Sequence, residues 1–238
     1  MTIGEEIRVD FNTGSGGGSG AGGPSGGTGG PPPRVSGGAS RGDFNLRDPV
    51  QSFINTVRNV AFRPVDFFRG IPRRGDFLNP LAFALICVIV SSLLGGLIGV
   101  VVNLGFTDQG VVGAFVGFIF GIIRSLISAA IGLFIGALIW WLLSLLFARP
   151  NNTGYEATFR VAAYSSVVYL VSWIPVLGWI VGAIYGIYLG VVGIREVHGT
   201  TTGRAALVVL VPIVVIGGLA LLIFGVALLA IFAAASQQ

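Results

Sequence analysis

Charged residues are scarce in this chain of 238 residues, since they make up 10% of it against about 25% in an ordinary soluble domain. Hydrophobic residues make up 53%. This imbalance excludes a free-standing soluble globule, and the high hydrophobic content excludes wholesale disorder. The charges are also spread unevenly, because residues 1–78 hold 16 of the 24 and residues 79–238 hold 8. The sequence therefore predicts a charged front joined to a membrane-embedded body.

Residues that carry chemistry are equally rare. The only cysteine is Cys87 and the only histidine is His198, which excludes a disulfide framework and a cluster of Cys and His metal ligands. We interpret His198, close to Glu196, as a solvated loop residue. The serines of the apolar stretches have no membrane-embedded His, Lys or Asp that could activate them. We therefore expect no enzyme activity, no metal and no cofactor.

The front divides at residue 48. Residues 1–47 are rich in Gly, Pro and Ser, bury nothing that would offset their ordering entropy, and are predicted to form a disordered tail. The tripeptide Arg41-Gly42-Asp43 in this tail matches a cell-adhesion motif, and we interpret it as a chance match. Residues 48–78 are predicted to form an amphipathic juxtamembrane segment, because Asp48-Pro49 is typical of a helix start and apolar residues then recur at helical spacing.

Phenylalanines and arginines alternate in the second half of that segment. An apolar face beside arginines suits a helix lying among anionic headgroups, and a helix packed on the protein's own surface is the alternative. We expect anionic lipid headgroups as partners and no nucleic acid, since no nucleic-acid-binding module surrounds the arginines. The residues predicted to bind the membrane surface are Arg58, Arg63, Phe67, Phe68, Arg69, Arg73 and Arg74.

Long uncharged stretches define the body, residues 79–235. About 20 apolar residues are enough to cross a bilayer core. Residues 111–148 are apolar except for Arg124 and too long for one simple crossing, so we expect a short interfacial or re-entrant helix before the second span. The predicted fold class is thus an all-α bundle of five transmembrane helices, with spans at about 80–102, 122–147, 158–174, 176–194 and 205–233.

The arginines orient this bundle. Nine precede the first span, two flank the loop 149–160 and two flank the loop 195–204, whereas the loops 103–110 and 173–179 contain none. Cytoplasmic loops carry the excess of basic residues. The N-terminus is therefore predicted to be cytoplasmic.

Glycines recur every four residues in the fourth predicted span, at Gly178, Gly182, Gly186 and Gly190. Small residues at this spacing let helix backbones approach closely. We favour packing within the bundle, and contact with a second copy or another membrane protein is the alternative.

Arg124 is the one charge inside an apolar run. A charge at such a depth is costly and often functional. We favour a snorkelling arginine within about two turns of the outer surface, paired with Asp108. The alternative is a polar path that joins Arg124 to Tyr164, Ser165 and Tyr169 of the third span.

From about Arg63 to its end, the chain resembles the Yip domain family, the Rab-interacting membrane proteins of eukaryotes and their bacterial relatives. The similar segments are FRPVDFFRGI, YEATFRVAAYSS, the turn IPVLGW, and GIREVHGTTTGRAALVVLVP. The resemblance implies a five-helix domain with a cytosolic N-terminus, and vesicle traffic as the role of the eukaryotic members. Their acidic Asp-Leu-Tyr-Gly-Pro motif is absent here, which argues against a Rab-type GTPase as partner. The composition resembles that of a bacterial protein, so the expected location is the bacterial cytoplasmic membrane.

Two functions from different classes follow. The first is a non-enzymatic integral membrane protein that organises a membrane or scaffolds partners, with a homo-oligomer or other membrane proteins as its contacts. The second is a small transporter or channel with a polar path near Arg124. They differ in structure, because a transporter needs a water-accessible cavity that reaches the bilayer midplane, whereas a scaffold can be solidly packed.

Overall fold

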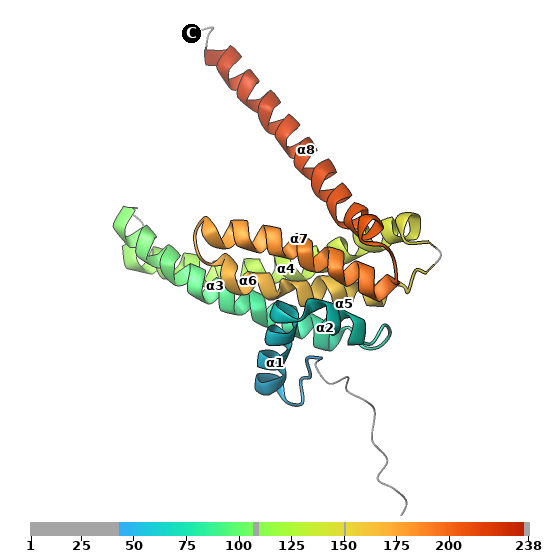
Figure 1. Ribbon diagram of the computed structural model, residues 1–238. Helices are drawn as coiled ribbons and strands as arrows, with labels where there is room; N and C mark the ends of the chain where they lie inside the picture. Colours follow the sequence, from blue (N-terminus) through green and yellow to red (C-terminus); the bar gives the residue numbers. More distant parts are fainter. Residues whose placement is uncertain (1–42, 107–109, 150, 236–238) are drawn as a thin grey trace, which may run out of the picture. The chain divides into compact units, whose positions relative to one another are not determined.

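A computed structural model describes residues 43–106, 110–149 and 151–235 of the chain (Figure 1). The predicted tail up to residue 42 lies outside these residues. Every regular element that the structure describes is helical, which confirms the all-α class. The elements are α1 (Pro49–Phe62), α2 (Pro64–Gly70), α3 (Leu78–Phe106), α4 (Gly110–Phe147), α5 (Tyr155–Ser165), the 3-10 helix η1 (Ser166–Val168), α6 (Tyr169–Ser172), α7 (Leu177–His198) and α8 (Thr202–Ala235).

Four of these helices, α3, α4, α7 and α8, are long and apolar enough to cross a membrane. The third predicted span, 158–174, is not confirmed, because this part of the chain is divided among α5, η1 and α6. The 11 residues of α5 are mostly buried and include Arg160. Because α3, α4 and α7 all pack against α5, this central segment does not need an apolar surface.

The short helix expected before Arg124 is absent, and this prediction is corrected. Residues 110–147 form one continuous helix of 38 residues, about 57 Å long. No proline interrupts it. The long α3 runs beside α4 and makes extensive contact with it, so two helices support each other where a break was predicted (Figure 1).

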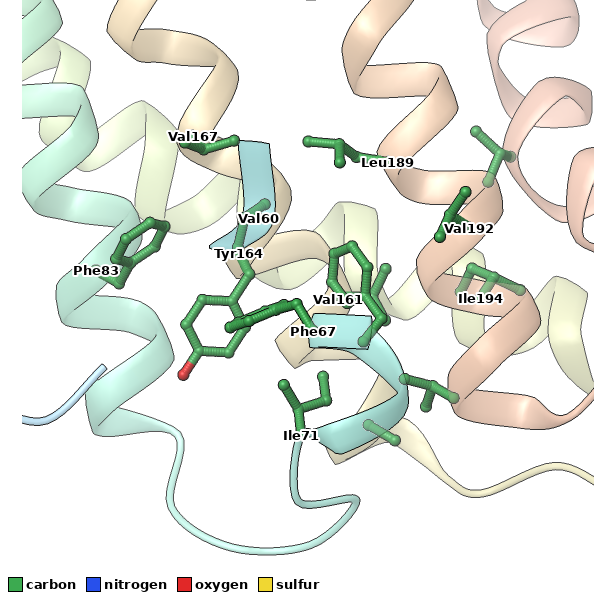
Figure 2. Close-up of a cluster of buried hydrophobic side chains, with 14 of the residues drawn as sticks. Val60, Phe67, Ile71, Phe83, Val161, Tyr164, Val167, Leu189, Val192 and Ile194 are labelled. Atoms are coloured by element: carbon green, nitrogen blue, oxygen red, sulfur yellow. The ribbon is translucent and has the colours of Figure 1, made fainter. Parts of the chain in front are cut away.

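An aromatic core joins the N-terminal helices to the body. Phe67 and Phe68 of α2 are 7% and 1% exposed, and the rings of Phe67 and Phe83 lie 5.0 and 5.3 Å from the ring of Tyr164 (Figure 2). The prediction that Phe67 and Phe68 contact lipid is therefore wrong, because α2 turns them inward, against its neighbours. Phe44 is also buried in this core. The predicted boundary of the tail at residue 47 is thus corrected, since residues 43–47 belong to the folded part.

Candidate functional site

A wide, open cavity of about 980 Å³ lies between α3, α4, the central segment α5–α6, α7 and the start of α8, and Arg124 and Ser128 on its lining are exposed. Its volume is at the upper end of the range for ligand sites. Seven serines line it, a polar surface that is unusual inside a body built of apolar helices. The polar residues of the lining are Ser91, Ser92, Arg124, Ser125, Ser128, Ser165, Ser166, Tyr169 and Ser172.

Arg124 lies far from the helix ends. The hydroxyl groups of Ser92 and Ser125 are 2.7 Å apart, so residue 124 of α4 stands at the level of residue 92 of α3. Ser92 is the middle residue of the 29 residues of α3, about 21 Å or four turns from either end. A snorkelling arginine lies near a helix end, where its head group reaches water. Measured along α3, the level of Arg124 is thus about four turns from either helix end, farther than the two turns expected between this residue and the outer surface.

The cavity brings together some of the residues of the predicted polar path. Ser165 and Tyr169 line it together with Arg124. The hydroxyl of Ser165 is buried and has no hydrogen-bond partner among the described residues. Arg124 likewise forms no ion pair within the described part of the chain. Asp108, its predicted partner, lies outside the described residues. The cavity thus contains a cation without an ion-pair partner and a hydroxyl donor without a hydrogen-bond partner among the described residues.

Tyr164 does not line the cavity but lies next to it, in the aromatic core (Figure 2). Its hydroxyl donates a hydrogen bond to the carboxylate of Asp43. The same carboxylate is 3.5 Å from the guanidinium of Arg160, whose side chain is 3% exposed. Arg160 also donates a 2.8 Å hydrogen bond to the carbonyl of Asp76 and lies 3.6 Å from its carboxylate. This Asp43–Arg160 network attaches the segment that precedes α1 to helix α5. One of its members, Tyr164, is the residue before Ser165.

Burial raises the pKa of Asp43 to about 6, against a smaller opposing effect of the Arg160 guanidinium. Between the ordinary pKa near 3.8 and this value, the folded protein binds a proton that the unfolded chain does not. We therefore expect stability to fall as the pH rises through this window, by up to about 3 kcal/mol, and then to level off above pH 6.

This pH dependence is checked by melting temperatures in detergent between pH 4 and pH 8. Asp43→Asn should flatten the profile in the window, because it removes the titrating group. The exposed Asp48→Asn is the matched control and should keep the wild-type profile. A wild-type melting temperature that rises from pH 4 to pH 6 would contradict the expectation.

The comparison with known families matches the same part of the chain that contains the helical body. The Yip1 domain matches residues 58–234, about three quarters of the sequence. The chain belongs to the Yip1 domain family. No curated protein and no solved structure matches it. With its four long apolar helices, this Yip1 domain protein is a multi-pass integral membrane protein.

His198 of the Yip1 domain is not a solvated loop residue, and that interpretation is corrected. It ends α7 and is 1% exposed. Its Nδ1 accepts a hydrogen bond from the backbone N–H of Thr153 at 3.1 Å, so the proton is on Nε2, which donates to the hydroxyl of Thr158 at 3.0 Å. His198 therefore ties the end of α7 to the start of α5, as a structural group.

The five arginines predicted to bind the membrane surface are all exposed, at Arg58, Arg63, Arg69, Arg73 and Arg74. Phe62, between the first two, is 82% exposed. Arg69 also forms a 3.0 Å ion pair with Glu196. Phe62 is thus an exposed aromatic residue beside these arginines, whereas the two phenylalanines of α2 are buried.

The four evenly spaced glycines of α7 pack within the protein. A Cβ added to Gly178 would lie 2.0 Å from the carbonyl oxygen of Val171, and one on Gly190 would lie 2.9 Å from Trp140. Gly182 and Gly186 face Ser172 and Val168 of the central segment. Gly193 is packed in the same way against Val161, although the spacing of four did not predict it. The glycines other than Gly190 let α7 lie close to the central segment, and Gly182 and Gly186 line the cavity.

Proposed function

We propose that this Yip1 domain protein takes an anionic group into the cavity beside Arg124, as a small transporter or carrier. The observation that supports this most strongly is the position of Arg124 on a serine-lined cavity, level with the middle of α3. A guanidinium in such a place favours an anion, because it presents several N–H donors at a fixed geometry. The buried, unpartnered hydroxyl of Ser165 adds a further donor.

The wider setting is part of the same proposal. The family is one of non-enzymatic membrane proteins, in keeping with the expectation that this chain is not an enzyme. We propose that the central segment α5–α6 completes a five-crossing arrangement, that the N-terminus is cytoplasmic, and that the membrane is the bacterial cytoplasmic one. The excess of arginines on the N-terminal side supports the orientation.

A scaffold at the membrane surface is the second candidate function. It is supported by the exposed Phe62, which stands among the exposed arginines of α1 and α2. Such a surface suits anionic headgroups, because each basic residue near an anionic leaflet contributes about 1 kcal/mol. The two functions are compatible, since the arginine surface and the cavity use different residues.

The cavity is tested with cysteine variants and charged thiol reagents. Ser128 lines the cavity, whereas Ile127 is 56% exposed on the same helix and does not line it. In membranes, we expect Ser128→Cys to react at least about tenfold faster than Ile127→Cys, because the reactive thiolate forms in water and not among acyl chains. Native Cys87 is fully buried, so the wild-type chain is the unreactive reference.

Charge selectivity in this assay isolates Arg124. Relative to free cysteine, Ser128→Cys should react faster with an anionic than with a cationic methanethiosulfonate, and a second substitution, Arg124→Gln, should remove this preference. Arg47→Gln, at an exposed arginine outside the cavity, is the control for the change in net charge. Equal rates at positions 127 and 128, or a preference that Arg124→Gln leaves intact, would refute the proposal.

A further inference from the structure

We infer that the anionic ligand is a phospholipid, held with its phosphate beside Arg124 and one acyl chain in an adjoining apolar cavity. This inference rests on the proposed function, since it names the class of ligand for the same cavity. Three observations carry it: a second cavity that continues the first, two glycines that leave space in that second cavity, and apolar walls around the polar lining.

The second cavity has a volume of about 310 Å³ and shares seven lining residues with the polar one, so the two are continuous. The residues that it adds are all apolar: Ala84 and Leu85 of α3, and Gly132, Leu133 and Gly136 of α4. A hydrated anion gains nothing from such a surface. An acyl chain does, because the burial of each methylene group contributes about 0.8 kcal/mol.

The glycines of α4 in this second cavity serve no visible packing. A Cβ added to Gly132 or Gly136 would meet no atom within 4 Å, in contrast to Gly190 of α7, which Trp140 approaches closely. Glycine in the interior of a helix makes that helix less stable than alanine would. At these two positions its effect is to leave open the space beside the polar cavity, which a larger side chain would fill.

The polar cavity is itself amphipathic. Besides the serines, its lining includes apolar residues such as Trp140 of α4, Ile187 of α7, and Val209 and Ile213 of α8. Val209 is buried, but Ile213, one turn later, is 47% exposed, and the large apolar side chains described beyond it on α8 are exposed as well. The packing of α8 thus ends at the margin of the cavity, which leaves a route for a lipid from the bilayer.

The charge of the lining selects among lipids. Among the described residues, Arg124 is the only charged one that lines the polar cavity, and no carboxylate of this part of the chain lines it to pair with a choline or an amine. A phosphate accepts hydrogen bonds from the guanidinium fork and from serine hydroxyls. We therefore expect a net negative phospholipid to bind at least about tenfold more tightly than a zwitterionic one, a difference equal to one charge-assisted hydrogen bond.

The experiment uses the full chain in detergent micelles. Native mass spectrometry gives apparent dissociation constants for phosphatidylglycerol and phosphatidylcholine, and protection of Ser128→Cys from the thiol reagent is measured for inorganic phosphate and glycerol 3-phosphate. Gly136→Leu fills the apolar cavity, and Gly225→Leu, at an open position in the interior of α8 that lines none of these cavities, is the matched control. Melting temperatures establish that both variants are folded.

The expected result is that Arg124→Gln and Gly136→Leu each weaken phosphatidylglycerol binding about tenfold or more, whereas Gly225→Leu does not. Protection of Ser128→Cys by the soluble phosphates should be lost in Arg124→Gln but kept in Gly136→Leu. If phosphatidylglycerol binding is unaffected by Gly136→Leu while the soluble phosphates still depend on Arg124, the lipid inference is wrong and the proposed function stands. If neither the lipid nor the soluble phosphates depend on Arg124, both are wrong.

Discussion

Replacement of Arg160 by methionine is expected to lower the free energy of unfolding by about 3–5 kcal/mol. The side chain of Arg160 is almost completely buried, and it is the only cation that pairs with Asp43 among the described residues. Methionine fills much of the same volume but leaves the Asp43 carboxylate in a buried place without its partner. The cost of breaking a buried pair is large because the remaining charge is uncompensated.

Reversible unfolding in mixed micelles, followed by circular dichroism, measures this loss. Arg74→Met is the matched control, because Arg74 is exposed and such substitutions stay within about 0.5 kcal/mol. The double variant Arg160→Met, Asp43→Asn should be less destabilised than the sum of its parts, since the second change removes the unpaired charge. The cost of Arg160→Met should also be smaller at pH 5 than at pH 8, because Asp43 is neutral at the lower pH. Additive effects at pH 8 would contradict the pairing.

Much of the fold could be predicted from the sequence, because the features concerned are local. The Asp48-Pro49 start of α1 and the apolar runs of α3, α4, α7 and α8 are visible as composition and spacing. The family could likewise be identified from contiguous segments. The predicted break in α4 rests on the length of the apolar run alone. The length of a run carries no information about the contacts that α3 makes along α4.

The polar groups could not be placed, because their partners are distant in the sequence. Asp43 and Arg160 are separated by 117 residues, and the tripeptide that contains Asp43 was interpreted as a chance match. His198 was interpreted as solvated because the loop after it is polar, but its partners, Thr153 and Thr158, come from another segment. The serines around Arg124 lie on three separate stretches, and only the packing of the helices brings them to one cavity.

The largest contrast between two similar variants is expected at Gly178 and Gly186 of α7. Gly178→Ala should destabilise the protein by about 3 kcal/mol or more, at the upper end of the cost of overpacking, because its Cβ would lie 2.0 Å from the backbone oxygen of Val171. A backbone atom cannot rotate away as a side chain can, so α7 has to move away from α6. Gly186→Ala should instead stabilise the protein by about 0.5–1 kcal/mol, because its Cβ meets Val168 at an ordinary 3.8 Å and alanine favours the helix.

Stability changes of opposite sign at these two positions of the same helix would distinguish an effect of close packing from an effect of helix propensity. Both substitutions add the same methyl group to α7, so a general effect of hydrophobicity or of helix propensity would change both melting temperatures in the same direction. Thermal unfolding in detergent, with the rate of thiol labelling at Ser128→Cys as a second readout, distinguishes the cases. If Gly178→Ala displaces α7, the wall of the cavity moves with it, and the labelling rate should change together with the melting temperature, whereas Gly186→Ala, which adds one methyl group to the wall without moving α7, should change the rate much less. A Gly178→Ala protein as stable as the wild type would mean that α7 does not approach α6 as closely as the structure places it.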